Sequence, residues 1–285
     1  MTEQAPKVSI IIPSTDGYRD GNVPRLMDAI KRQDFKGIEI VVVKGVSPGS
    51  EARNEGARRA KGRFLVFIDD DVKIDRDDLI TNLVKTLEED PKIGMAGAPM
   101  VVPEDATFFQ KRTIEECSWA YSPVIDKTRD SDLVCHACQA IPRRLYLELG
   151  GENPELLRGE DAEFHNRMRE AGYRIVLAAN TGVYHPPYRD LPALVKERFM
   201  SGFLGARDQV YYPHLIFEYG SGYTKEFRRK YAFSIRIMRF IFNRIIFSVL
   251  RLRFIRLIFY VSYGAGRISG LLVFGFKRYV IQKKP

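Results

Sequence analysis

The sequence predicts a doubly wound α/β domain with a mostly parallel sheet, followed by a basic helical region towards the C-terminus. Over residues 1–100, fully apolar β-branched runs alternate with amphipathic segments. Charge is also unevenly distributed: residues 1–190 hold 27 Lys and Arg against 32 Asp and Glu, whereas residues 191–285 hold 18 against 4. Because the net charge of +9 lies in the last third, it does not indicate a nucleic-acid-binding protein.

Four apolar runs are expected to form strands buried on both faces of the sheet, at residues 8–12, 38–43, 64–68 and 93–98. The segments between them have the pattern of surface helices and span residues 24–33, 50–60 and 77–89. A further helix is expected at 161–171 and a short strand at 174–178. In such sheets ligands bind at the carboxyl ends of the strands. The candidate site residues therefore follow the runs, at 13–16, 44–50 and 69–71.

The composition, 45% apolar and 28% charged residues, is that of a folded protein. Three cysteines (Cys117, Cys135, Cys138) are too few for a disulfide framework, and no signal-peptide pattern opens the chain. We therefore expect a protein of a reducing compartment that faces the cytosol. Residues 257–276 are the nearest approach to a membrane span, with Arg267 as their one charge.

Asp69, Asp70 and Asp71 directly follow the third apolar run. Three adjacent carboxylates repel one another unless a cation lies among them, so the triplet predicts a divalent metal, Mg²⁺ or Mn²⁺, held together with phosphate oxygens. The alternative is a solvated turn that caps the helix beginning near residue 77.

The run RNEGARRAKGRFLVFIDDD resembles the nucleotide-sugar-binding segment of family 2 glycosyltransferases with a GT-A fold, and the resemblance covers most of residues 8–188. It implies that Asp69 contacts the ribose side of the nucleotide and that Asp70 or Asp71 ligates the metal. The implied nucleotide-sugar-binding residues are Pro13, Ser14, Asp16, Arg53, Asp69 and Asp70, and the implied metal ligands are Asp69, Asp71 and His185. His185 enters as a third ligand, in TGVYHPP, because several family members place a histidine there.

The sequence departs from this family after the second strand. Family members usually carry aspartates there, one of which recognises the base, but this chain reads Lys44-Gly45-Val46. A lysine cannot accept a hydrogen bond from a base N–H. The base of the donor therefore stays open, and Lys44 either faces a phosphate or is exposed.

The segment Gly159-Glu160-Asp161 opens a predicted helix. Acidic residues are also common in the first turn of any helix, where they interact favourably with the helix dipole and can accept hydrogen bonds from free N–H groups. The order GG, GEDAEFHNRM, AGYRI is similar to the catalytic-base region of the same glycosyltransferases. This resemblance implies that Asp161 is the general base for an acceptor hydroxyl and that Glu160 helps to position acceptor or base.

Three further segments are given weaker roles. Cys135-His136-Ala137-Cys138 has no second CxxC to complete a zinc site, so we expect its cysteines to be small buried residues. Arg143 and Arg144 either contact the diphosphate or are solvated. The stretch from Arg198 to Arg207 is similar to the acceptor-side helix of related enzymes.

The basic tail has the pattern of membrane-binding amphipathic helices. On a helical wheel, Asn243 and the arginines of 229–251 (Arg229, Arg236, Arg239, Arg244, Arg251) fall in one arc, and Arg256, Arg267 and Arg278 form one stripe. The alternatives are that these helices pack on the catalytic domain, or that 257–276 spans or re-enters the bilayer.

The resulting hypothesis is an inverting, metal-dependent glycosyltransferase at the cytoplasmic face of the cell membrane, acting on a lipid-linked glycan and not on nucleic acid. The alternatives are a polyprenyl-phosphate sugar synthase, a nucleotidyltransferase on a sugar phosphate, and an inactive sugar-binding domain tethered by its tail. The expected organisation is a catalytic domain at 1–190, with a nucleotide-sugar half at 1–100 and an acceptor half at 101–190. An acceptor-side helix and connection at 191–226 and membrane-associating helices at 227–285 follow.

Overall fold

The computed structural model describes residues 5–117, 121–131, 134–215, 238 and 241–282. The chain forms two compact units that are not continuous in sequence. Unit 1 contains residues 1–104, 119–154 and 163–186, and unit 2 contains residues 105–118, 155–162 and 187–285. The boundaries differ from a single division near residue 190, because two earlier segments belong with the C-terminal helices.

Unit 1 is built on a seven-stranded sheet in the order β2-β1-β3-β7-β4-β8-β6. The first three strands are parallel, and β7 runs antiparallel to both of its neighbours. The strands are β1 (Val8–Ser14), β2 (Ile38–Lys44), β3 (Phe64–Ile68), β4 (Ile93–Gly97), β6 (Arg129–Asp130), β7 (Cys138–Pro142) and β8 (Arg174–Leu177), and β5 (Met100–Val101) pairs separately with β9 (Val183–Tyr184). The four strands expected from apolar runs, and the mostly parallel sheet, are confirmed.

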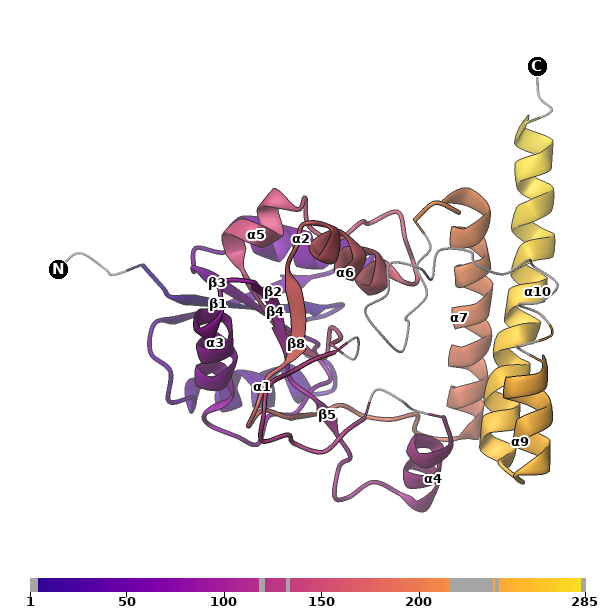
Figure 1. Cartoon of the computed structure of the whole chain (residues 1–285), viewed down its shortest axis with the longest axis horizontal. Coiled ribbons are helices and arrows are strands. Elements are labelled where there is room, and N and C mark those ends of the chain that lie inside the picture. The colour runs from indigo at the N-terminus through magenta and orange to yellow at the C-terminus, as the bar shows by residue number, and fades with distance from the viewer. Residues whose placement is uncertain (1–4, 118–120, 132–133, 216–237, 239–240, 283–285) are drawn as a thin grey trace. The chain divides into compact units, whose positions relative to one another are not determined.

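Helices cover both faces of this sheet (Figure 1). One core joins it to α1 (Asn22–Lys31) and α3 (Leu79–Glu89), and the other joins it to α2 (Gly49–Arg59), α5 (Arg143–Glu148) and α6 (Glu160–Glu170). β1 and β3 are buried almost throughout because both faces are covered, as their apolar runs predict. A Cβ at Gly56 would collide with Ile11, so a glycine is what lets α2 lie close on β1.

Unit 2 is helical. α7 (Leu191–Tyr211) and α10 (Phe254–Gln282) run side by side, as Figure 1 shows, with α4 (Phe108–Cys117), α9 (Phe247–Leu250) and a π-helical turn (Ile241–Ile246). The close approach of the two long helices needs glycine on both: a Cβ at Gly202 would collide with the Tyr263 carbonyl, and one at Gly266 with the Phe199 carbonyl. This small-residue contact is the type that packs membrane helices.

The arginine stripe of α10 contacts protein. The backbone N–H of Arg256 donates to Glu116 of α4, Arg267 lies beside Gly205 of α7, and Arg278 donates to the Val210 carbonyl. The stripe is therefore half-buried within unit 2. Arg229, Arg236 and Arg239 lie outside the described residues.

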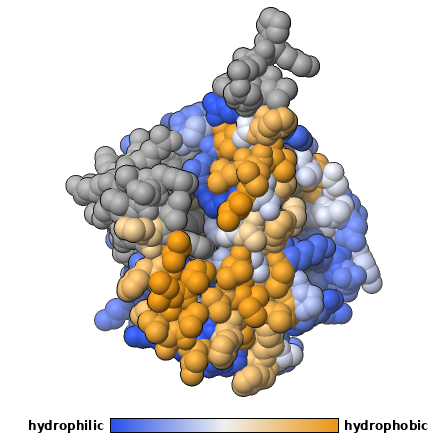
Figure 2. All heavy atoms as spheres, turned by 90° about the vertical axis from the view of Figure 1, so that its right-hand side faces the viewer, coloured by the Kyte–Doolittle hydropathy of each residue, from blue (hydrophilic) through white to orange (hydrophobic). Residues whose placement is uncertain are grey.

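The other face of α10 is apolar and exposed (Figure 2). Side chains at positions 254, 261, 268, 272 and 276 are 52–70% exposed, and they are Phe254, Val261, Ile268, Leu272 and Phe276. Phe242 and Leu250 add to the exposed apolar side chains of the unit. By length and composition, the segment 254–278 could cross a membrane, although one such helix is weak evidence that it does.

Candidate functional site

The carboxylate triplet lies where β3 ends, next to the carboxyl end of β1. Asn22, in the first turn of α1, donates from Nδ2 to the carbonyl oxygens of Asp70 at 2.7 Å and Val72 at 3.1 Å. This amide therefore fixes the backbone of the triplet. Ser14, the last residue of β1, is buried and hydrogen bonds to the Asp70 side chain. The adjacency of parallel strands thus brings together two residues that the sequence predicted in one site.

Arg53 joins the first carboxylate from α2. Its Nη2 donates to Asp69 Oδ1 at 2.8 Å, and the guanidinium is almost fully buried. Burial raises the pKa of the Asp69 carboxyl, but the charges of Arg53 and then His136 outweigh that effect, and the pKa is lowered. Asp69 is therefore an ionised acceptor at neutral pH.

Arg19 is a site residue that the sequence did not reveal. It lies in the loop after β1 with a left-handed φ of 48°, and its guanidinium reaches Asp70 at 3.6 Å and Asp71 at 3.3 Å. Burial raises the pKa of the Asp70 carboxyl, with the neighbouring Asp71 and Asp69 adding to it, and Ser14 and Arg19 only partly oppose it. Nothing in the local pattern of an exposed loop arginine marks such a role.

His185 is brought to the triplet by strand pairing. Tyr184 of β9 exchanges both backbone hydrogen bonds with Lys73, two residues after the triplet. The imidazole Nε2 then lies 3.5 Å from Asp71 Oδ1, and the Tyr121 hydroxyl donates to the His185 carbonyl. Asp71 Oδ1 is a buried oxygen without a hydrogen-bond partner.

That donor set fits a divalent cation. A buried carboxylate oxygen beside an imidazole, with two further carboxylates adjacent in sequence, offers the ligand types that such ions accept. Among the described residues, no three His, Cys, Asp or Glu side chains are already arranged as a complete metal site. The ligands would therefore have to move closer together when an ion binds.

The loop after β1 also holds Asp16 and faces the end of β2. Asp16 Oδ1 accepts the N–H groups of Tyr18 at 2.8 Å and Arg19 at 2.9 Å, and these bonds lower the pKa of its exposed carboxyl. Asp16 thereby shapes the loop that carries Arg19. Lys44 is exposed, and its side chain lies against Gly17, where a Cβ would collide with it. Pro13 is half-buried in β1.

Glu160 and Asp161 lie in the first turn of α6 and belong to unit 2. Both are half-buried, and Asp161 Oδ1 accepts the N–H of Ala162 at 2.8 Å. The segment before them is held by Asp208 of α7, which is fully buried and accepts the backbone N–H groups of Leu157 and Arg158. Asp208 was not singled out from the sequence.

The two predicted acceptor-side arginines occupy different settings in unit 2. Arg198 stacks over the rings of Phe259 at 4.0 Å and Tyr263 at 5.0 Å, so it packs between α7 and α10. Arg207 pairs with Asp208 at 2.6 Å and donates to the Glu155 carbonyl. Arg207 therefore supports the segment that leads to Asp161.

Arg143 and Arg144 lie away from the triplet. β7 is antiparallel to β3, and its last residue, Pro142, pairs with Phe64 at the start of β3. The two arginines therefore follow at the opposite end of the sheet from Asp69, and Arg144 is exposed and paired with Glu148. The diphosphate-contact alternative for them is wrong. Cys138 is buried, as expected, whereas Cys135 is half-buried; Cys117 is also buried, and none of the three cysteines forms a disulfide.

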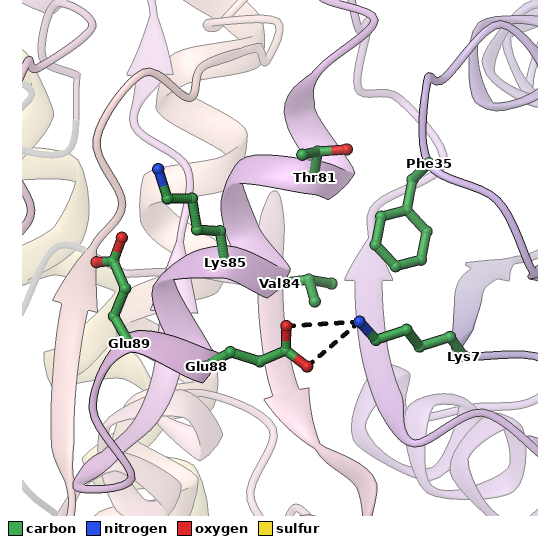
Figure 3. A pocket seen from close by; sticks show the side chains of 7 residues that line it. All are labelled: Lys7, Phe35, Thr81, Val84, Lys85, Glu88 and Glu89. Carbon is green, nitrogen blue, oxygen red and sulfur yellow. Dashed lines mark hydrogen bonds and ion pairs between the residues drawn. The ribbon is translucent and has the colours of Figure 1, made fainter.

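A shallow hollow at the same far end is drawn in Figure 3. It is lined by side chains from the start of β1, the loop before β2 and α3, with Lys7 paired to Glu88 at 3.3 Å. Because it lies at the amino ends of the strands, it is separate from the carboxylate triplet.

Comparisons with known proteins agree on one family. A family model described as glycosyltransferase like family 2 matches residues 4–201. An uncharacterized glycosyltransferase of Haemophilus influenzae is 25% identical over 184 residues, 55% of this chain and 60% of that protein. The O-antigen biosynthesis protein RfbC of Myxococcus xanthus is 23% identical over 261 residues, 74% of this chain and 20% of the relative. The chain thus spans between 20% and 60% of the length of these curated relatives.

One solved structure has a similar fold. The mannosyltransferase PcManGT from Pyrobaculum calidifontis, in complex with GDP-Man and Mn²⁺, has a TM-score of 0.59 at 14% identity. The match covers 94% of this chain and 88% of that one. At this identity the likeness concerns the fold.

Proposed function

The chain belongs to the family 2-like glycosyltransferases and has their GT-A fold, and we propose that it transfers a sugar from a nucleotide sugar to an acceptor hydroxyl with inversion. The observation that carries the proposal is the buried, unbonded oxygen of Asp71 beside His185. Relatives named for O-antigen and poly-β-1,6-N-acetyl-D-glucosamine synthesis support a role in polysaccharide assembly. The solved complex with GDP-Man supports a nucleotide-sugar donor.

In this proposal Asp69, Asp71 and His185 hold Mn²⁺ or Mg²⁺, and Asp70 and Ser14 line the donor site. The bound ion would neutralise negative charge on the leaving nucleoside diphosphate. Arg53 keeps Asp69 ionised, and Arg19 compensates Asp70 and Asp71. When the donor's phosphates arrive, the exposed guanidinium of Arg19 is free to contact them instead.

Asp161 acts as the general base. Its carboxylate accepts the proton of the acceptor hydroxyl as the oxygen attacks the anomeric carbon and the bond to the diphosphate breaks. The N–H of Ala162 holds one carboxylate oxygen, and Glu160 adjoins it in the same helical turn. A phosphate acceptor is already ionised and needs no base, so Asp161 favours a sugar hydroxyl over a bare polyprenyl phosphate.

The reaction class is tested by its products. Purified protein is incubated with Mn²⁺, a panel of nucleotide sugars and lipid-linked glycan acceptors. We expect free nucleoside diphosphate to appear together with a lengthened glycan. In a parallel incubation with a nucleoside triphosphate and a sugar 1-phosphate, pyrophosphate release with formation of a nucleotide sugar would instead identify a nucleotidyltransferase. With a nucleotide sugar and polyprenyl phosphate, formation of a glycosylated polyprenyl phosphate would identify the synthase alternative.

The exposed apolar face of α10 is proposed to lie on the cytoplasmic surface of the cell membrane, where a lipid-linked acceptor would be presented. A continuous row of exposed apolar side chains, with no acidic residue after Glu226, suits an anionic bilayer. Arg251 and Lys277 of the same unit are exposed and add positive charge near the helix.

We expect Leu272→Asp with Phe276→Asp to lower the vesicle-bound fraction at least about tenfold, because each lost side chain removes roughly 1.5–3 kcal/mol of apolar burial. Binding is measured by co-sedimentation with vesicles of phosphatidylcholine and phosphatidylglycerol. The matched control is Leu147→Asp, an exposed leucine on α5 of unit 1. Equal binding by both variants would contradict the membrane assignment.

A further inference from the structure

Glu152 is a buried carboxylate that no step of the proposed reaction uses. It follows Gly150-Gly151, and its side chain is fully shielded from solvent. Its Oε1 lies 3.0 Å from Nε2 of His136, and its Oε2 lies 3.4 Å from Nη1 of Arg53. His136, from the Cys135–Cys138 motif, and Arg53, from the donor site, therefore both contact the carboxylate of Glu152.

The turn that carries Glu152 is itself fixed. Asn54 of α2 accepts the Glu152 N–H at 2.9 Å and donates to its carbonyl at 2.8 Å. Gly151 has a φ of 71°, and a Cβ there would collide with Asn54, so this approach requires glycine. Arg167 of α6 holds the same turn by donating to the Gly151 carbonyl at 2.7 Å.

Arg53 therefore bridges two carboxylates through different nitrogens. Nη2 donates to Asp69 and Nη1 contacts Glu152, both within a nearly buried environment. A planar guanidinium bound at both edges has a defined orientation, which a lysine could not reproduce. A buried ion pair contributes little net folding stability. The orientation that the two carboxylates impose on the Arg53 guanidinium is therefore the simpler explanation of this cluster.

We infer that Glu152 is a positioning residue of the donor site, which holds Arg53 and His136 beside Asp69. It touches neither donor nor acceptor and acts through the arginine and the histidine. The inference rests on the proposed function, because it takes Asp69 and Arg53 to receive the nucleotide.

The test measures equilibrium binding of UDP and of GDP, each with Mn²⁺, by calorimetry. We expect Glu152→Gln to weaken binding of the nucleotide that the wild type binds more tightly, by about tenfold. Because Glu152 acts through Arg53, the double variant Glu152→Gln with Arg53→Lys should bind no more weakly than Arg53→Lys alone. The control, Glu116→Gln, removes another buried carboxylate that is paired with an arginine, Arg112, in unit 2. It should lower the melting temperature and leave nucleotide affinity unchanged.

A second readout needs no nucleotide. In ¹⁵N-labelled protein, Glu152→Gln should shift the ring nitrogen signals of His136 and leave those of His185 in place. Unchanged nucleotide affinity in Glu152→Gln, or effects that add to those of Arg53→Lys, would overturn the inference. If the wild type bound neither nucleotide, the proposed donor site would fail, while the His136 signals would still report on the Glu152 contact.

Discussion

Asp161→Asn is expected to lower kcat by roughly 100- to 10,000-fold, the range that general-base catalysis contributes, and to leave nucleotide-sugar binding unchanged. An asparagine keeps the oxygen that accepts the Ala162 N–H, so this hydrogen bond in the first turn of α6 is retained. What is lost is the ability to take a proton. Steady-state kinetics with saturating donor and calorimetric donor binding separate the two effects.

The matched control is Asp190→Asn. Asp190 also stands at a helix start, where it accepts the N–H of Ala193 at 2.8 Å as the N-cap of α7. It should change stability by a similar small amount and leave kcat unaltered. Turnover by Asp161→Asn near the wild-type rate would remove the base assignment, and equal losses in both variants would point to helix capping instead.

Asp71→Asn is expected to abolish the effect of Mn²⁺ on nucleotide binding. The substitution keeps the size of the side chain and removes the charge from the buried oxygen beside His185. Mutation of residues that only orient metal ligands lowers metal affinity about 10- to 100-fold, so mutation of a ligand itself should lower it at least roughly 100-fold. Calorimetry of UDP and GDP, with Mn²⁺ and with EDTA, measures the difference.

The control for this variant is Asp75→Asn, which removes one negative charge from an exposed residue shortly after Asp71 in the chain. It should retain the full tightening of nucleotide binding by Mn²⁺. If Asp71→Asn also retained it, the metal would have to bind elsewhere, and the role of the triplet would be wrong.

Local pattern was enough to predict much of the fold. The strands expected at 8–12, 38–43, 64–68 and 93–98 end within two residues of the observed ones. β1, β3 and β4 are buried almost throughout, because a strand covered on both faces has to be apolar. The expectation of burial on both faces is wrong for β2, which lies at the edge of the sheet and is only half-buried. The antiparallel place of β7 between β3 and β4 was not predicted. Strand order depends on contacts between distant segments, which no local periodicity records.

The residues of the candidate site were likewise predicted only in part from the sequence. Ser14 and the aspartates of the triplet could be selected because strand ends meet at one edge of a parallel sheet. Arg19, Asn22 and His136 could not, since a loop arginine, a helix-start asparagine and a histidine between cysteines carry no signal of their own. Each joins the site through contacts with residues far away in the sequence.

The amino-acid sequence by itself determined the strands and helices of residues 8–98 and 161–178, the three acids at a strand end and a tail with no acidic residue after Glu226, because each is a property of neighbouring residues. Only the tertiary structure decided which face of α10 is left uncovered. It turned the arginine stripe towards α4 and α7 and left the apolar row exposed, since glycine-mediated packing of α7 against α10 selects the buried side. It likewise decided that Glu152, unremarkable in sequence, shares the guanidinium of Arg53 with Asp69.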